Sequence, residues 1–387
     1  MSRISWNVAR LAFVAVSCAA LLTQTSSPAL AGGPDAGRFK FGYEPTSPDI
    51  LGELDDRLPN SSVRDLVDGA NRQARACEAP VARLAASFCW NDDDAETGRW
   101  MPQGITTSAD AEKDGLYQDR RILITSWYDT GDGGDDDKGS RITFVNLTDP
   151  AAPTYRHVVL VAPTGRAGSA SFAPIRIHAG GLAWYGDRLF VADTWRGVRV
   201  FDLSHIWRPA ADSPDQLGLQ PDGSYQGYGY AYVLGQSGLY RHTTDDGERG
   251  LRFSFLSVDR GAGRDSLLAG EFSASGDGTR LARIPLGKEG MPWEGEDGFV
   301  RCDEVHVVSL GNMQGVAHVG ERYLFATSED AGNGGDLTAW RPGGKATTEY
   351  DVFPPGPEDL SYWESRDQLW SLSEHPGQRF VYAITPG

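Results

Sequence analysis

The sequence is short of cysteine and of basic residues, and each shortage limits what the protein can be. Its four cysteines include no Cys-x-x-Cys pair, so a structural zinc site is not expected. Lys and Arg total 36 against 53 Asp and Glu, which gives a formal net charge of −17. A surface this acidic repels phosphate backbones and anionic lipids, so nucleic acids and membrane surfaces are poor expected partners.

Several catalytic signatures are missing as well. The chain contains no Gly-x-Ser-x-Gly, no His-Glu-x-x-His and no Gly-x4-Gly-Lys-Ser/Thr sequence, which leaves out a nucleophile elbow, a zinc-protease helix and a phosphate-binding loop. Beyond residue 31 there is no long uncharged apolar run, so no membrane span is expected in the mature protein.

The N-terminus has the three regions of a secretory signal. Arg3 and Arg10 precede an apolar stretch, Leu11–Leu22. The segment Ala29–Ala31 then places small residues at the cleavage positions. We therefore predict a signal peptide over residues 1–31 and a secreted mature chain of 356 residues with net charge −19, since the signal carries two arginines and no acid. Cys18 raises the alternative of a lipid anchor, but the residues before it lack the expected leucine.

Three cysteines remain after cleavage: Cys77, Cys89 and Cys302. An oxidising compartment permits disulfides, and we predict one between Cys77 and Cys89, worth about 2–3 kcal/mol for so short a loop. Cys302 is then left over, and the sequence leaves open its pairing with either of the others.

A repeat runs through the chain from about residue 101. Four segments align without gaps and a fifth is a weaker copy; each opens with a polar or aromatic residue, continues with apolar residues and ends with small and then polar ones. The segments are Arg121–Tyr128, Arg188–Trp195, Tyr323–Asp330, Gln368–His375 and the weaker Ser266–Ser273. Fixed recurrence of this kind is typical of repeat architectures.

What surrounds each copy recurs too. A short strand-like stretch precedes it, and an alternating stretch follows it, as period-two patterns of half-buried strands do. The preceding stretches are Gln103–Thr106, Gly180–Ala183, Ser254–Ser257, Gln314–Ala317 and Glu358–Ser361. The following ones are Arg141–Leu147, Gly197–Leu203, Thr279–Leu286, Leu337–Trp340 and Arg379–Ile384, with a fourth strand after most copies.

A sheet of three or four such strands cannot cover both of its faces alone, and radial stacking covers them with neighbours. We predict an all-β fold, a β-propeller over residues 101–387, with five blades. Six is the alternative, because the first copies are spaced more widely than the ~40–50 residues typical of such repeats. The last copy lacks a fourth strand. The partly helical N-terminal extension, residues 32–100, is expected to supply it from Arg38–Tyr43 or Val81–Trp90.

The second repeat carries a resemblance. His178–Trp184, Arg188–Asp193 and Gly197–Leu203 together resemble a blade of the secreted bacterial propellers with NHL-like or YVTN-like repeats, over about residues 101–384. The resemblance implies the fold, but such propellers include enzymes and binding proteins. The six-bladed gluconolactonase-like enzymes are similar at this level, and their metal ligands cannot be matched residue by residue here.

The loop Asp129–Asp137 is rich in acid and glycine. Carboxylates separated by glycines can wrap a hard cation, so we predict calcium with Asp129, Asp132, Asp135 and Asp137 as ligands. No EF-hand register fits this loop. The alternative is a solvated hairpin tip that binds no ion.

Equivalent positions of the repeats should form a ring at the mouth of the central channel, and many are polar. As acid–base groups or metal ligands we predict His178, Glu358, Asp359 and Glu374. As ligand-binding residues we predict Gln103, Asp193, Gln314, Glu329 and His375. The alternative is that a solvated channel tolerates polar residues, with Asp193 in an Asx turn and Asp359 capping backbone N–H groups.

These observations favour a secreted monomer that binds a small molecule, glycan or protein at the channel mouth. One alternative is a metal-assisted hydrolase or lyase acting on a carbohydrate, lactone or phosphoester. Another is a structural or partner-docking protein of the cell envelope. The sequence names no substrate.

Overall fold

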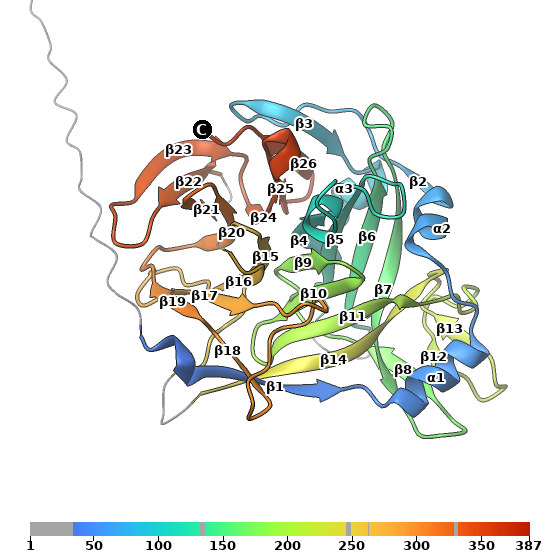
Figure 1. Ribbon diagram of the computed structural model, residues 1–387. Helices are drawn as coiled ribbons and strands as arrows, with labels where there is room; N and C mark the ends of the chain where they lie inside the picture. Colours follow the sequence, from blue (N-terminus) through green and yellow to red (C-terminus); the bar gives the residue numbers. More distant parts are fainter. Residues whose placement is uncertain (1–33, 132–135, 245–248, 262, 329–331) are drawn as a thin grey trace, which may run out of the picture.

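The computed structural model describes residues 34–131, 136–244, 249–261, 263–328 and 332–387. Figure 1 looks along the axis around which the sheets are arranged. The predicted signal peptide lies outside the described residues, so cleavage and secretion stay predictions. Within the described ranges, no helix combines the length and apolar character that crossing a membrane requires.

Most of the described chain is β-strand. Three antiparallel sheets of four strands follow one another around the axis in the described residues. Their orders are β15(Phe255–Asp259)-β16(Ser266–Gly270)-β17(Arg280–Pro285)-β19(Glu304–Val307), β20(Met313–Val319)-β21(Arg322–Thr327)-β22(Gly335–Trp340)-β23(Thr347–Phe353) and β24(Pro357–Trp363)-β25(Gln368–Ser373)-β26(Phe380–Ile384)-β3(Leu84–Cys89).

A larger sheet completes the arrangement. Its path is β4(Trp100–Thr107)-β5(Ile122–Asp129)-β6(Ser140–Asn146)-β7(Thr154–Thr164)-β14(Val233–Thr244)-β11(Gly197–Trp207)-β10(Arg188–Asp193)-β9(Leu182–Tyr185). Its two antiparallel halves meet where β7 and β14 pair in parallel. Each half carries one inner strand, β4 or β9, so the halves correspond to two successive repeats.

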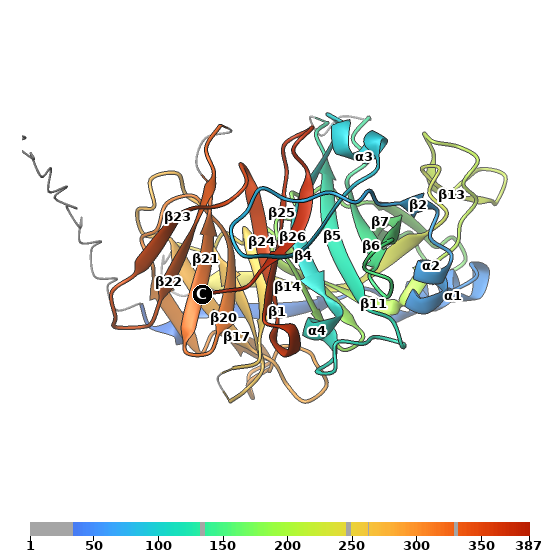
Figure 2. The same ribbon diagram turned by 90° about the horizontal axis from the view of Figure 1, so that it is seen from above.

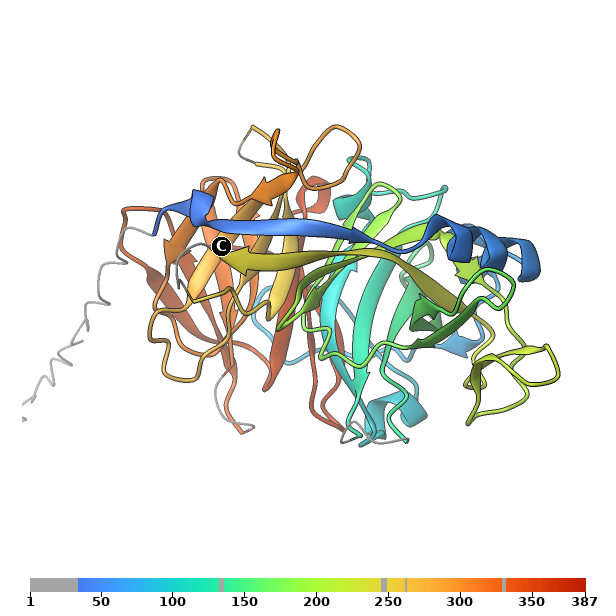
Figure 3. The same cartoon turned by 90° about the horizontal axis from the view of Figure 1, so that it is seen from below.

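The remaining elements lie at the periphery. Strand β1(Phe39–Pro45) runs along β14, as Figures 2 and 3 show from two sides, and by its hydrogen-bond register it also pairs with β18(Phe299–Arg301). Strands β2(Arg72–Gln73) and β8(Ser171–Pro174) pair with β7, and β12(Leu217–Leu219) pairs with β13(Tyr225–Gly227). The helices are α1(Pro48–Arg57), α2(Val63–Asp68), α3(Asp92–Glu96), α4(Ser108–Ala111) and the 3-10 turns η1(Ala36–Arg38) and η2(Glu364–Arg366).

The inner strands form a closed ring. Strand β4 contacts β9, β9 contacts β15, β15 contacts β20, β20 contacts β24, and β24 contacts β4 again. Each inner strand also pairs with the second strand of its own repeat. The chain therefore has the radial arrangement of a β-propeller, with the apolar faces of neighbouring sheets packed on each other.

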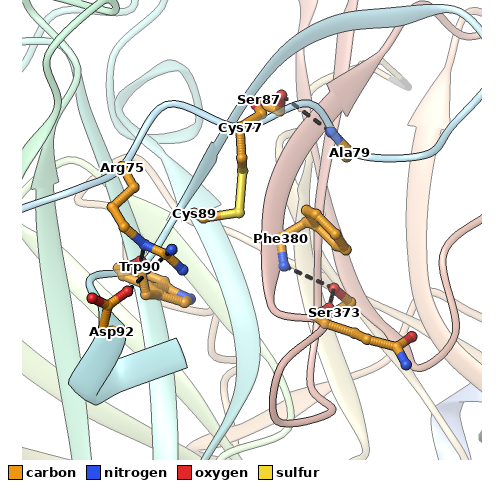
Figure 4. Close-up of a disulfide and its surroundings, with 10 residues drawn as sticks. Arg75, Cys77, Ala79, Ser87, Cys89, Trp90, Asp92, Ser373 and Phe380 are labelled. Carbon is orange, nitrogen blue, oxygen red and sulfur yellow. Dashed lines mark hydrogen bonds and ion pairs between the residues drawn. A yellow bond between two sulfur atoms is a disulfide. The ribbon is translucent and has the colours of Figure 1, made fainter. Parts of the chain in front are cut away.

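The ring closes through a strand from the N-terminal extension. Strand β3 pairs with β26 near the C-terminus, with Cys89 opposite Phe380. The segment Val81–Trp90 therefore provides the outer strand of the last sheet, whereas Arg38–Tyr43 contributes to β1 beside β14. Figure 4 shows a disulfide between Cys77 and Cys89 at the end of β3. Cys302 is buried and has no disulfide partner among the described residues.

A buried polar network crosses the sheet of β4–β7. The indole of Trp127 donates to Thr143 Oγ1 at 2.7 Å, that oxygen lies 2.7 Å from His157 Nδ1, and His157 Nε2 lies 3.0 Å from Asp94. Burial, aided by the charge of Arg141, lowers the pKa of His157 to about 3. Burial acts to raise the pKa of Asp94, but the hydrogen bond from His157 and the nearby positive charges outweigh it and lower that pKa. The network locks the sheet without offering an accessible nucleophile.

Candidate ligand-binding site

A pocket of about 460 Å³ opens between the first two repeats, where β5 and β10 end. Strand β5 ends at Asp129 and β10 ends at Asp193, and both residues line the pocket. The repeat alignment places these two positions at equivalent strand ends, so the local fold brings them to the same face. Other lining residues are Tyr128, Asp137, His178 and Trp195.

Aromatic faces form part of the wall. The rings of Tyr128 and His178 stack with centroids 4.4 Å apart and an angle of 28°. Trp195 is 75% exposed, although it is a large apolar side chain at a pocket. The guanidinium of Arg252 lies 5.0 Å from the centre of its ring, which holds the indole in place from one side. The exposed ring face is therefore available to a ligand.

The carboxylate of Asp129 already accepts hydrogen bonds from an arginine and from the backbone. Arg99 Nη2 donates to it at 2.7 Å, Arg99 Nε lies 3.0 Å from its Oδ2, and the backbone N–H groups of Lys138 and Gly131 also donate to it. Burial acts to raise the pKa of Asp129, but the hydrogen bonds from Arg99 and the backbone lower it overall. Asp129 is thus an ionised group that organises the turn.

The calcium prediction concerns the same turn. Asp137 accepts from the backbone N–H of Gly139 at 2.7 Å and lies 3.6 Å from Arg176 Nε. Asp132 and Asp135 lie outside the described residues. Within the described ranges, no group of three or more His, Cys, Asp or Glu side chains is placed to hold a metal ion. Calcium binding at this turn therefore stays a prediction.

Asp193 combines a turn with an ion pair. Its Oδ2 accepts from Arg199 Nε at 2.9 Å, and its Oδ1 accepts from the backbone N–H groups of Trp195 at 3.4 Å and Arg196 at 3.2 Å. The Asx-turn alternative is therefore present in the structure, and it is this turn that projects Trp195 outward. A carboxylate paired with arginine can still accept hydrogen bonds from a ligand hydroxyl, because each oxygen has two lone pairs.

A second polar group lies nearer the axis. Glu374 accepts from the Gln103 amide at 3.0 Å, and its other oxygen lies 4.0 Å from His375 Nδ1. Glu358 is only 3% exposed. Burial, then the charges of Glu374 and Asp359, raise the pKa of Glu358 well above its ordinary value. Burial also raises the pKa of Glu374.

Tyr128 interacts with both groups. Its ring lines the pocket and stacks on His178. Burial raises the pKa of its hydroxyl, and the charges of Glu374 and Glu358 add to this effect. The phenol is therefore coupled electrostatically to the axial carboxyl groups while one face of the ring meets the pocket.

Asp359 connects the inner strands of different repeats. It is fully buried, and its Oδ2 accepts from the backbone N–H of Ile105 on β4 and of Leu182 on β9, each at 3.0 Å. Its backbone has φ of 44°, and a Cβ on Gly315 would come within 2.6 Å of its carbonyl carbon. Its Oδ1 is buried and has no hydrogen-bond partner among the described residues. A catalytic role for Asp359 stays a prediction, because its known contacts join inner strands.

The remaining predicted residues divide as follows. Gln314 lies on β20 and donates to Ser328 Oγ at 3.3 Å, away from the pocket lining. Glu329 lies outside the described residues. The structure therefore gathers Asp129, Asp137, His178 and Asp193 around one pocket, and Gln103, Glu358, Glu374 and His375 into an axial group.

Sequence reasoning missed the most exposed aromatic residue of the site. Trp195 is the last position of an aligned repeat segment, where the other four copies end in Tyr, Asp, His or Ser. A tryptophan in a turn two residues after an Asx-forming aspartate is exposed unless a neighbour covers it. That signal pointed to a ligand contact, but tryptophan also packs between blades, so the pattern alone did not decide it.

No protein-family model matches the chain, and none of the curated proteins matches it either. Solved structures with a related arrangement include hydrazine synthase of Kuenenia stuttgartiensis, with 12% identity, a TM-score of 0.32 and coverage of 71% of this chain and 74% of that chain. The GH43_1 enzyme from Xanthomonas citri shows 11% identity, a TM-score of 0.31 and coverage of 79% of this chain and 89% of that chain. Drosophila Semaphorin 1b shows 9% identity, a TM-score of 0.29 and coverage of 80% of this chain and 88% of that chain. Likenesses of this strength say nothing about what this chain binds.

Proposed function

We propose that the protein is an exported β-propeller that binds a saccharide in the pocket between its first two repeats. The observation that carries the proposal is the exposed indole of Trp195, held by Arg252 at the rim of a pocket whose other wall is the stacked Tyr128–His178 pair. A sugar ring has an apolar C–H face and a polar edge. Flat aromatic faces suit the first, and paired carboxylates and guanidinium groups suit the second.

The size and charge of the pocket support a small polar ligand. Its volume of about 460 Å³ falls within the range of about 300–1,000 Å³ common for small-molecule sites. The three lining aspartates, Asp129, Asp137 and Asp193, each have an arginine partner, so the wall is polar without a large net charge. A neutral sugar unit can bind there without bringing an uncompensated charge into the pocket.

Two further elements belong to the proposal. The first is the count of five blades, supported by the closed ring of β4, β9, β15, β20 and β24 within the described residues. The second is export, supported by the N-terminal pattern and by a Cys77–Cys89 bond of the kind that persists in oxidising compartments. N-terminal sequencing of protein from the culture medium tests export, and a species that still begins at Met1 would contradict it.

Tryptophan fluorescence and calorimetry with a panel of neutral oligosaccharides test saccharide binding. We expect a panel member to bind wild type, and Trp195→Ala to weaken that binding about tenfold or more, as removal of a central aromatic contact does. Trp293→Ala is the matched control, because Trp293 is 51% exposed and stacks on Arg264 at 5.0 Å, away from this pocket. Equal losses in both variants, or no binding at all to wild type, would contradict the proposal.

A hydrolase or lyase is the second candidate, favoured by Glu358 and Glu374. Two neighbouring carboxyl groups with raised pKa values can share the roles of acid and base, because one holds its proton while the other is ionised. Incubation with the bound saccharide, followed by product analysis, tests this. Products that wild type forms and that Glu374→Gln does not form, although the variant still binds the saccharide, would support an enzyme. A saccharide that wild type leaves unchanged would contradict catalysis and support binding without a reaction.

A further inference from the structure

A second pocket, of about 350 Å³, lies on the other side of the turn that follows β5. Its charged lining residues are all basic: Arg72, Arg99, Lys138 and Arg156. No carboxylate of a described residue lines it, although the whole chain has a net charge of −17. Arg72 and Arg99 have carboxylate partners, Asp94 and Asp129, that do not line the pocket, so the surface that faces a ligand is positive.

The ion pairs around the pocket leave donors available. Arg72 Nε lies 3.3 Å from Asp94, which is shared with Arg141 and His157. Lys138 Nζ donates to the Pro214 carbonyl at 2.8 Å and lies 3.9 Å from an aspartate whose side chain is 87% exposed. An ammonium group has three donors, so most of the capacity of Lys138 is not used by these contacts.

Arg156 provides an independent observation. Its Nε is buried and has no hydrogen-bond partner among the described residues, while its Nη2 donates to the Gly69 carbonyl. A buried N–H without an acceptor is unfavourable, because it has lost its hydrogen bonds to water. Arg156 also lines the second pocket, so the guanidinium N–H groups that reach its surface can donate to an anion bound there.

Aromatic side chains complete the wall. Trp100 and Tyr228 line the pocket together with the four basic residues, and Lys138 Nζ lies 5.6 Å from the Tyr228 ring centroid. Tyr228 has φ of 56°, an unfavourable conformation for a tyrosine, and its N–H donates to the Gln216 carbonyl at 2.8 Å. The turn thus holds an aromatic face beside the cations. The ligand that fits is an anion carried on a flat or ring-shaped body.

The two pockets share a partition. Asp129 lines the first pocket, Arg99 lines the second, and the two side chains form the ion pair described above. Asp137 and Lys138 are adjacent in the chain, yet Asp137 lines the first pocket and Lys138 lines the second. An oligomer that crosses this ion pair would place neighbouring units in the two sites.

We infer that the second pocket binds the carboxylate or sulfate of an acidic sugar unit whose neighbour occupies the first pocket. This rests on the proposed saccharide binding and narrows it to acidic oligosaccharides. Arginine and lysine recognise both groups through charge-assisted hydrogen bonds, so the shared chemistry is an anionic substituent on a sugar ring.

Calorimetry with matched ligands tests the inference. The probes are tetragalacturonate and its fully methyl-esterified form, in which each carboxylate charge is removed by a methyl group, and a sulfated galactan tetrasaccharide with its desulfated form. We expect one charged probe to bind more tightly than its neutral partner and to lose affinity as salt is raised. The uronate and sulfate pairs separately show which anion is recognised.

Variants assign the effect to the pocket. Lys138→Gln and Arg156→Gln should each weaken binding of the charged probe about tenfold and leave its neutral partner nearly unchanged. Lys288→Gln, an exposed lysine remote from this pocket, is the control. Melting temperatures establish that each variant is folded. If Arg156→Gln does not fold, the test is the salt dependence of the affinity for the charged probe, compared between wild type and Lys138→Gln.

The outcomes separate this inference from the proposed function. Equal binding of charged and neutral probes, with a loss in Trp195→Ala but none in Lys138→Gln, would overturn the anion site and retain saccharide binding. Tighter binding of a charged probe that depends on Lys138 but not on Trp195 would retain an anion site and contradict the first pocket. Absence of binding by all probes would overturn both.

Discussion

The Oδ2 atom of Asp359 lies 3.0 Å from the backbone nitrogen of Leu182, 177 positions earlier in the chain, and accepts its hydrogen bond in a fully buried place. The same oxygen accepts from Ile105. One side chain of the last repeat therefore satisfies backbone donors of the first two. This contact joins the ends of the ring near its axis, where the inner strands of neighbouring sheets form no β-ladder with one another in the described part of the chain.

Removing that acceptor should weaken the ring. We expect Asp359→Ala to lower the free energy of unfolding by at least about 2–4 kcal/mol, because two buried N–H groups lose their partner. Asp359→Asn should cost less, since it keeps an acceptor and asparagine tolerates positive φ. Denaturant unfolding measures both. Equal stability of the alanine variant and wild type would show that these hydrogen bonds do not hold the ring.

Glu358→Gln should stabilise the protein as pH rises. The raised pKa means that the folded state holds a proton on Glu358 that the unfolded state releases above about pH 4.5. The stability of wild type that comes from this proton is present at acid pH and is lost as pH rises through the folded pKa. Glutamine mimics the protonated form, so its advantage should grow between pH 5 and pH 8 by at most about 1.4 kcal/mol per pH unit.

Thermal or chemical unfolding at several pH values checks the Glu358 prediction. Glu112→Gln, which removes an exposed glutamate, is the control and should show no such trend. A Glu358→Gln variant whose stability difference from wild type stays constant with pH would mean that Glu358 is ionised normally in the folded protein.

His157 should make the protein sensitive to mild acid. Its folded pKa of about 3 lies below the unfolded value near 6.5, so only the unfolded state takes up a proton between these pH values. The free energy of unfolding should therefore fall as pH drops below 6.5, by up to about 1.4 kcal/mol per unit. His157→Gln should flatten that slope. Unfolding curves from pH 7 to pH 4.5 measure it, and parallel slopes for variant and wild type would refute the assignment.

The disulfide should hold the closing strand. We expect the double variant Cys77→Ser, Cys89→Ser to lose about 3 kcal/mol of unfolding free energy, because the unfolded chain regains the freedom of a short loop. A reducing agent should lower the melting temperature of wild type and leave that of the double variant unchanged. The buried thiol of Cys302 is present in both, so a reductant effect that persisted in the variant would point to Cys302 instead.

Much of the strand plan was readable from the sequence. The repeat segments around Leu189, Leu324 and Leu369 lie in β10, β21 and β25, each the second strand of its repeat. Hydrophobic periodicity is a local property, and a strand that buries one face must alternate. The same logic predicted a missing outer strand for the last repeat, but it could not choose between the two N-terminal candidates, because strand pairing is non-local.

The site was readable in part. Equivalent repeat positions located Asp129 and Asp193 at strand ends on one pocket, since equivalent residues of stacked repeats lie at related heights. The partners of those carboxylates were not readable. Arg99 comes from before β4 and pairs with Asp129, one of the predicted calcium ligands, and nothing local in the sequence indicates that pairing.

The sequence by itself determined the all-β class, the recurring unit and the acidic, cysteine-poor character of the chain, because these follow from composition and short-range periodicity. Only the tertiary structure decided that β3 closes the last sheet, that Asp359 bridges the inner strands and that four basic side chains gather around one pocket. These residues are far apart in the chain, and only the folded arrangement of strands brings them within the few ångströms at which hydrogen bonds and charges act.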